Sequence, residues 1–160
     1  MPNGSSEFLI DTNIVVYAFD RSEPVKQARA ISVLDQLAAS ARGAMSAQAL
    51  AEFFSVATTK IPSPLSPADA RTRLEEFVRN FTIYAVTPAI VLEAARGVEE
   101  HRMSFWDAQV WATAKLNQVG VVLSEDLQGW GFLEAVQFVN PLVETFDLSH
   151  RTGRDLDEIL

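Results

Sequence analysis

The chain has 160 residues, no cysteine and a formal net charge of −8 at pH 7. This length suits one domain with its own core. The lack of cysteine excludes disulfides, thiolate metal sites and a cysteine nucleophile, as is usual in the cytoplasm. No apolar run approaches the ~20 residues of a membrane span, and no signal peptide is recognisable. The acidic balance counts against passive nucleic-acid binding more than against metal-dependent chemistry on phosphates.

Short apolar runs alternate with longer helical patterns along the chain. Between residues 24 and 40, apolar residues recur at about every third position, which predicts a helix. Proline, serine and threonine stand where several of these patterns start, as expected for helix N-termini. In chain order, the predicted elements are a strand at 8–11, a helix at 24–40, a strand at 44–45, helices at about 46–60 and 66–79, a strand at 81–86, helices at about 87–101 and 104–118, and strands at 121–123 and 136–139.

This alternation predicts an α/β fold with a mostly parallel sheet and helices on both faces. We expect a single domain over residues 1–143. The stretch 3–8 (NGSSEF) resembles a cloning scar, and residues 144–160 form a polar, acidic tail that is either frayed or docks a partner. In open α/β sheets, ligands bind outside the carboxyl ends of the strands, so we expect the site there.

Four acidic residues stand in otherwise apolar surroundings, although most of the 21 acids lie among other charges. A bare carboxylate in such a place costs several kcal/mol unless something compensates it. Two of the four follow predicted strands. They are Asp11 in FLIDTNIVVYAF, Glu52 in SAQALAEFFSVATT, Asp107 in MSFWDAQVWATA, and Asp126 in VVLSED.

Each of these acids also has a purely structural interpretation. Asp11 could cap a helix that follows the first strand. Asp107 lies three residues after Ser104, which fits a capping box, and Asp126 could cap a short turn. Glu52 stands in mid-helix, where capping cannot explain it and a salt bridge is the structural alternative.

Carboxylates that converge in a cleft repel one another, so the site must hold protons or bind cations. Oxygen-only ligands favour Mg²⁺, Mn²⁺ or Ca²⁺. With no cysteine and no nearby histidine, such a cluster points to phosphoryl-transfer chemistry, in which the ion activates water and offsets charge on phosphate oxygens.

The motifs FLIDTNIVVYAF, LAEFF, SFWDAQVWATA and LSEDLQ, in this order, resemble the PIN domain and, within it, the VapC-type toxin ribonucleases. The resemblance covers about residues 7–142. It implies a PIN-like three-layer sandwich with about five mostly parallel strands. It also implies Mg²⁺- or Mn²⁺-dependent cleavage of RNA, a homodimer, and a cognate antitoxin that blocks the site.

On this resemblance, Asp11 and Asp107 are expected to be the primary metal ligands. Glu52 would hold or orient the attacking water or act as its general base, and Asp126 would contact a metal through water or complete a second site. The neighbouring Glu125 leaves open which acid points inward, and the family pattern favours Asp126. The expected hydrogen-bond partners of these carboxylates are Thr12, Asn13 and Ser124.

Several other side chains have weaker assignments. Lys60 and Arg102 are candidate contacts to RNA phosphates, although charges at helix ends are usually only solvated. Four aromatic residues suit either a base-stacking platform or, more commonly, core or dimer packing; these are Phe53, Phe54, Trp106 and Trp111. The histidines, His101 and His150, lack metal-ligand spacing and are expected at the surface.

Two other readings remain open at this point. A haloacid-dehalogenase-like phosphatase also begins with an aspartate after the first strand, but usually has a second aspartate where this chain has Asn13. A non-enzymatic module, either receiver-like or a degenerate PIN scaffold, is the alternative from a different class. A receiver would need an adjacent acidic pair near the first strand end, and a degenerate PIN domain would lack one of the four acids.

Overall fold

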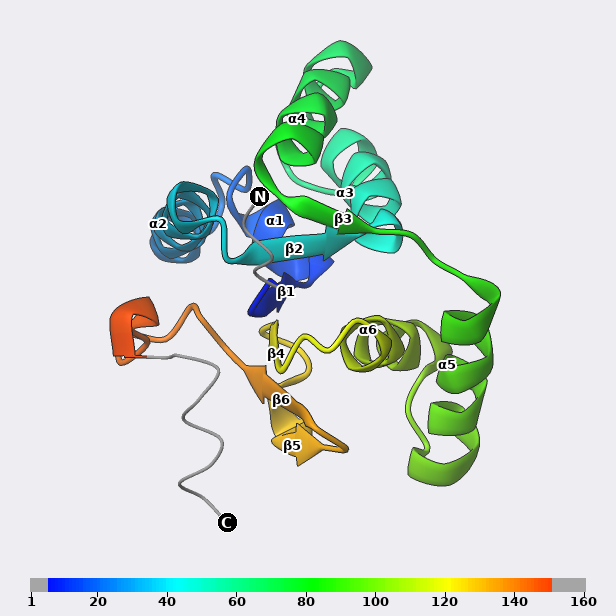
Figure 1. Ribbon diagram of the computed structural model, residues 1–160. Coiled ribbons are helices and arrows are strands. Elements are labelled where there is room, and N and C mark those ends of the chain that lie inside the picture. The colour runs from blue at the N-terminus through cyan, green and yellow to red at the C-terminus, as the bar shows by residue number, and fades with distance from the viewer. Residues whose placement is uncertain (1–5, 151–160) are drawn as a thin grey trace.

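The computed structural model describes residues 6–150, in which six strands form one sheet with the order β3-β2-β1-β4-β6-β5 (Figure 1). Residues 3–5 of the expected cloning scar, residues 151–160 of the tail and the side chain of His150 lie outside the described part. The strands are β1 (Phe8–Ile10), β2 (Gly43–Ser46), β3 (Thr82–Tyr84), β4 (Val121–Leu123), β5 (Phe132–Leu133) and β6 (Val136–Val139).

The helices after residue 20 agree closely with the predicted pattern, and a short helix not among the predicted elements follows β1. They are α1 (Thr12–Tyr17), α2 (Pro24–Ser40), α3 (Ala47–Thr59), α4 (Pro67–Asn80), α5 (Pro88–His101) and α6 (Phe105–Leu116), with short 3₁₀ turns η1 (Gln128–Trp130) and η2 (Leu148–His150). Four helices begin after a residue whose hydroxyl accepts a hydrogen bond from the first turn, which is a local reason for their start. These residues are Ser46, Ser66, Thr87 and Ser104.

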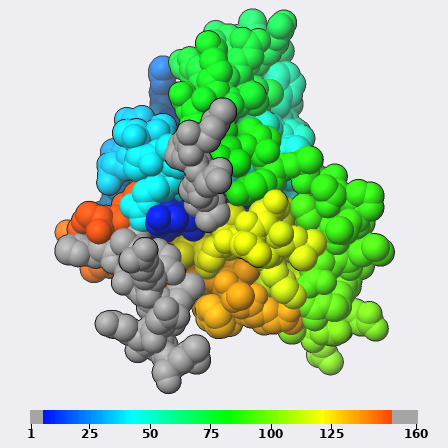
Figure 2. All heavy atoms as spheres, in the orientation of Figure 1, coloured from blue at the N-terminus to red at the C-terminus, as the bar shows by residue number. Residues whose placement is uncertain are grey.

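Neighbouring strands are parallel from β3 through β6, and only β5 is antiparallel to its neighbour. The predicted α/β class and the mostly parallel sheet are therefore confirmed. Strand β5 is not predicted by the sequence, because it has two residues and its Phe132 is exposed, so it shows no apolar run. In the space-filling view, the β5–β6 segment lies at the end of the molecule opposite α4 (Figure 2).

The sheet separates two apolar cores, which gives the molecule three layers. Successive side chains of β1 point to opposite faces. Phe8 and Ile10 pack with residues of α1, α2, α3 and α4 on one face, whereas Leu9 packs with residues of α5 and α6 on the other. Helices therefore cover both faces of the sheet, as predicted.

The first part of the expected tail lies against this body. Phe146 packs against the core that contains α2, and Leu148 of η2 is buried. In addition, Arg29 of α2 donates a hydrogen bond to the carbonyl of Leu142 (2.6 Å). The chain up to residue 148 thus belongs to the packed domain, and a partner-docking role for the tail stays a prediction. None of the helices described between residues 6 and 150 is both long and apolar enough to cross a membrane.

Candidate active site

A pocket of about 420 Å³ opens at the carboxyl ends of β1 and β4. Helices α1, α3 and α6 form its walls. The four predicted acids come from four different parts of the chain, and all of them line this pocket: Asp11, Glu52, Asp107 and Asp126. This is the sheet edge at which ligands bind in parallel α/β folds.

Asp11 directly follows β1 and is the N-cap of α1. One carboxylate oxygen accepts a hydrogen bond from the backbone N–H of Thr12 (2.8 Å), and the other accepts from the hydroxyl of Ser124 (2.8 Å). Ser124 is fully buried at the end of β4. The two neighbouring strands therefore hold the carboxylate in one orientation at the edge of the pocket.

Glu52 lies on α3 and is held at both carboxylate oxygens. The hydroxyl of Thr12 donates to Oε2 (2.9 Å), and the side-chain amide of Gln48 donates to Oε1 (2.8 Å). Gln48 lies one helical turn before Glu52, so the i, i+4 spacing brings the pair together. The structural alternative of a salt bridge is excluded, because no basic side chain among residues 6–150 forms an ion pair with Glu52.

The two adjacent acids after β4 have different surroundings. Glu125 forms an ion pair with Lys26 (3.0 Å) and accepts a hydrogen bond from the hydroxyl of Tyr17 (2.8 Å). Asp126 instead accepts from the side-chain amide of Asn13 (3.1 Å) and lines the pocket. Of this pair, Asp126 is the acid that the geometry places beside the other three.

Asn13 connects the groups that follow β1 and β4. Its amide nitrogen also lies near Asp11 (3.3 Å) and the hydroxyl of Ser124 (3.0 Å), while its carbonyl oxygen accepts from the backbone N–H of Glu125 (3.2 Å). Asn13 thus helps to position Asp11, Asp126 and the backbone at Glu125.

Asp107 is the least constrained acid of the pocket. Its backbone N–H donates to the hydroxyl of Ser104 (3.3 Å), which caps α6. Its half-buried carboxylate makes no hydrogen bond or ion pair within the described residues. The residues one helical turn further along, Val110 and Trp111, are buried, so the acid lies at the rim of an apolar helix face.

No basic side chain among residues 6–150 forms an ion pair with the four acids of the pocket. The pKa of Asp11 is raised from 3.8 to about 6, mainly by burial and to a smaller extent by the negative charges of Glu52 and Asp107, against the lowering effect of the hydrogen bonds from Ser124 and Thr12. A carboxyl with a raised pKa in a cleft is typical of functional sites. The donor set consists of carboxylate oxygens, which fits a hard divalent cation such as Mg²⁺ or Mn²⁺.

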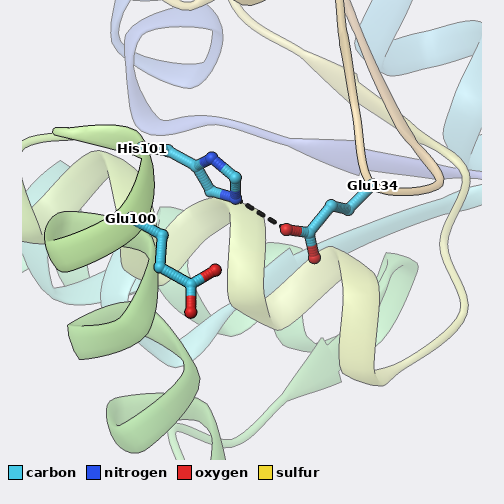
Figure 3. A group of neighbouring side chains, drawn as sticks. All are labelled: Glu100, His101 and Glu134. Carbon is cyan, nitrogen blue, oxygen red and sulfur yellow. Dashed lines mark hydrogen bonds and ion pairs between the residues drawn. The ribbon is translucent and has the colours of Figure 1, made fainter.

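A second group of titratable side chains lies closer together but has a different character. Glu100, His101 and Glu134 bring one ligand atom each within 4.8 Å of one another (Figure 3). However, Arg96 pairs with both glutamates (2.5 and 2.6 Å), and Lys115 also pairs with Glu134 (2.6 Å). The chain itself supplies the cations here, so this group is an ion-pair network rather than a metal site.

The network joins α5, α6 and the β5–β6 turn around Trp111. Arg96 and Lys115 lie over the Trp111 ring (5.5 and 5.1 Å to the centroid), and its indole N–H donates to the carbonyl of Leu133 (3.2 Å). Gly97 is needed for this packing, since a Cβ there would come within 2.9 Å of the ring. His101, expected at the surface, is instead half-buried and contacts Glu134 and Trp111.

Only some of the basic and aromatic residues considered as RNA contacts line the pocket. Lys60 is exposed at the end of α3 and is the one basic residue among the pocket-lining side chains of the described chain, whereas Arg102 does not line the pocket. Phe53 and Trp111 are fully buried and belong to the cores, but Trp106 is 61% exposed at the pocket.

Two residues important for the geometry were not recognised in the sequence. Gln48 holds Glu52, and the i, i+4 spacing was the available signal. Lys26 neutralises Glu125 across 99 residues of sequence, which no local pattern reveals.

The model of the PIN domain family matches residues 8–132, and the chain belongs to this family. The chain is similar in fold to a toxin–antitoxin complex from Klebsiella pneumoniae (TM-score 0.61, 19% identity, 83% of this chain and 96% of that chain). It is also similar to DNA-bound VapBC from Salmonella typhimurium (TM-score 0.61, 15% identity, 84% of this chain and 98% of that chain). A third similar structure is Mycobacterium tuberculosis VapC20, a sarcin–ricin loop cleaving toxin (TM-score 0.56, 16% identity, 79% of this chain and 97% of that chain). A search of curated proteins finds no match.

Proposed function

We propose that this protein is a metal-dependent endoribonuclease of the VapC type, which hydrolyses RNA phosphodiester bonds and is neutralised by a cognate antitoxin. One observation carries the proposal. Four carboxylates from separate elements line one open pocket, and none of them forms an ion pair with a basic side chain among residues 6–150.

The carboxylates of Asp11 and Asp107 would hold Mg²⁺ or Mn²⁺, with Asp126 as a further ligand, directly or through water. Such an ion, when bound, supplies a Lewis acid that activates water and offsets the charge of the phosphate oxygens. Glu52 would orient the attacking water and accept its proton. Its hydrogen bonds to Thr12 and Gln48 keep both oxygens fixed while it does so.

The polar neighbours act through the acids rather than on the substrate. Ser124 and Asn13 restrict the rotamers of Asp11 and Asp126, as hydrogen bonds around metal sites commonly do. Lys60, at the mouth of the pocket, would contact a phosphate of the RNA strand.

The similar structures support the partners in this proposal. One is described as a toxin–antitoxin complex, and three others, two VapBC structures and FitAB, are described as bound to DNA. We therefore propose an antitoxin partner, a homodimer and a cytoplasmic location for this chain. A small, basic, DNA-binding reading frame directly upstream in the genome would agree with this.

The decisive experiment is an RNA cleavage assay. The protein is incubated with mixed structured and unstructured RNAs in Mn²⁺, in Mg²⁺ and in chelator, beside an Asp107→Ala variant. We expect cleavage that requires the metal and that the variant lacks. Equal cleavage by the variant would indicate contamination, and its absence from the wild type would favour a non-enzymatic PIN module. A covalent phosphate on Asp11 would instead favour the phosphatase alternative.

A further inference from the structure

Trp106 occupies an unusual position for a large apolar side chain. It directly precedes Asp107 in the first turn of α6, yet it is 61% exposed, while Trp111 of the same helix is fully buried. Its ring packs edge-on against Phe105 (5.2 Å between centroids). The exposed indole therefore lies next to an acid of the pocket without belonging to either core.

A second, mainly apolar hollow of about 630 Å³ adjoins the acidic pocket. Trp106, Gln48 and Glu52 line both hollows, so the two meet at these three side chains. Val86 and Ala51 supply apolar walls of this second hollow. A strand whose phosphate lies at the carboxylates would thus meet an aromatic face and an apolar wall immediately beside them.

Two glutamine side chains, Gln48 and Gln109, line this groove, and their hydrogen bonds fix which way each amide group points. The Glu52 carboxylate accepts from the amide nitrogen of Gln48 (2.8 Å), so the amide oxygen of Gln48 faces Gln109 and accepts from its nitrogen (2.8 Å). This leaves Oε1 of Gln109 without a hydrogen bond in the described residues. Gln109 is only 5% exposed, but no fully buried side-chain oxygen in the described residues lacks a partner, so a small part of this oxygen reaches the groove that Gln109 lines.

We infer that this groove is a nucleobase subsite, in which Trp106 stacks on a base next to the cleaved phosphate and Gln109 accepts a hydrogen bond from an exocyclic amino group. The inference rests on the proposed function, since the acidic pocket must receive the phosphate. An aromatic ring beside a phosphate site is the usual device for holding single-stranded nucleic acid. A free acceptor in the groove favours cytosine, adenine or guanine over uracil, which has no amino group.

The first test uses short single-stranded RNAs that contain one mapped cleavage site, with the nucleotide on either side of the cut made abasic. For the wild type in Mn²⁺, we expect one abasic position to lower kcat/KM by about 10-fold or more, the range of base–aromatic stacking. Trp106→Leu, which keeps apolar bulk, should lose a similar factor on the intact RNA and little more on the abasic one. Trp106→Phe should restore most of the rate.

The opposite results are equally specific. If the kcat/KM loss from Trp106→Leu and the loss from the abasic position multiply when the two changes are combined, Trp106 does not contact that base. This result would overturn the inference. So would a Trp106→Leu protein that light scattering shows as a monomer beside a dimeric wild type and whose activity returns at high protein concentration, since Trp106 would then contact a second copy.

The second test separates this inference from the proposed function. Binding of intact and abasic oligonucleotides in Mg²⁺ is followed by stopped-flow quenching of tryptophan fluorescence, which records binding before any cleavage. Quenching that intact strands give and abasic strands do not, and that disappears in Trp106→Leu and Trp106→Phe because both remove the reporting indole, supports the subsite even if no RNA is cut. Equal quenching by both strands overturns it, whether or not cleavage occurs.

The hydrogen bond to Gln109 is tested by changing the base in the RNA and leaving the protein unchanged. RNAs that differ only by cytosine or uracil at the sensitive position are compared with the wild-type enzyme. We expect cytosine to be cleaved about 5-fold faster, which corresponds to one neutral hydrogen bond. Equal rates for the two bases would overturn the assignment of Gln109 as the acceptor.

Discussion

The acidic pocket and the ion-pair network around Trp111 contain carboxyl groups whose pKa values are shifted in opposite directions: upward for Asp11, downward for Glu93 and Glu134. In the network around Trp111, hydrogen bonds from Arg96 and Lys115 lower the pKa of Glu93 to about 2, and that of Glu134 falls even further below its usual range. In the pocket, burial and neighbouring negative charges raise the pKa of Asp11 to about 6.

The difference lies in the source of the positive charge. Arg96 and Lys115 are fixed parts of the fold, so the network is complete without any ligand and holds α5, α6 and the β5–β6 turn together. No basic group among residues 6–150 forms an ion pair with the acids of the pocket. A cation from solution would therefore interact strongly there and weakly in the network.

The sharpest test of this comparison is Asp11→Asn. We expect cleavage to fall by a factor of about 1,000 or more, since loss of a catalytic group is commonly this costly. Without metal, the variant should be more stable than the wild type at pH 7, by about 1 to 3 kcal/mol at ~1.4 kcal/mol per pKa unit. Urea denaturation in chelator measures this.

The pH dependence of that stability gain has a definite sign. Because the folded protein binds the Asp11 proton more tightly than the unfolded chain, the wild type loses stability as pH rises from 3.8 to about 6. The gain from Asp11→Asn should therefore fade below pH ~4. An Asp11→Asn protein that unfolds while the metal-free wild type stays folded would show that Asp11 is structural.

The two adjacent acids after β4 test whether a partner within the chain decides the role of a carboxylate. We expect Asp126→Asn to lower kcat/KM by about 10- to 100-fold, a typical cost of disturbing a metal site. Glu125→Gln is the matched control and should have little effect on cleavage, because Glu125 already pairs with Lys26. The reverse order of the two effects would show that Glu125 points into the site when RNA binds.

Lys60 tests the electrostatic contact with the substrate. Lys60→Ala should raise KM by about 5-fold, as for one exposed ion pair, with little change in kcat. The slope of log KM against log salt should fall by about 0.7, the value for one phosphate contact to a single strand. Arg102→Ala is the matched control, as Arg102 is exposed but does not line the pocket; an equal effect there would indicate only a general charge effect.

The smallest expected effect concerns the network. Glu134→Gln should lower the free energy of unfolding by about 1 kcal/mol, because the partly exposed pairs with Arg96 and Lys115 are screened by solvent. Since its folded pKa is depressed, the wild-type advantage should be present above pH ~4.5 and disappear as pH falls below it. Thermal unfolding measures this, with Glu75→Gln in the exposed Arg71 pair as the control. Cleavage should be retained.

The helices and the long strands could be predicted because their signals are local. Ser66 and Pro67 mark the start of α4, and Pro24 with the apolar period that follows it predicts α2 closely. The short β5 could not be predicted, since it exists only by pairing with β6. The exposure of Trp106 and the burial of Trp111, five positions apart on one helix, depend on what packs against each side of α6.

The sequence by itself determined the α/β class, the order of the elements and the four isolated acids. An apolar run, a capping residue or a lone charge acts within a few positions of the chain. Only the tertiary structure decided which of Glu125 and Asp126 lines the pocket, that Gln48 and Thr12 hold Glu52, and that the pKa of Asp11 rises. Burial and charge–charge interactions depend on distance in space, and the partners here are separated by up to 113 residues of sequence.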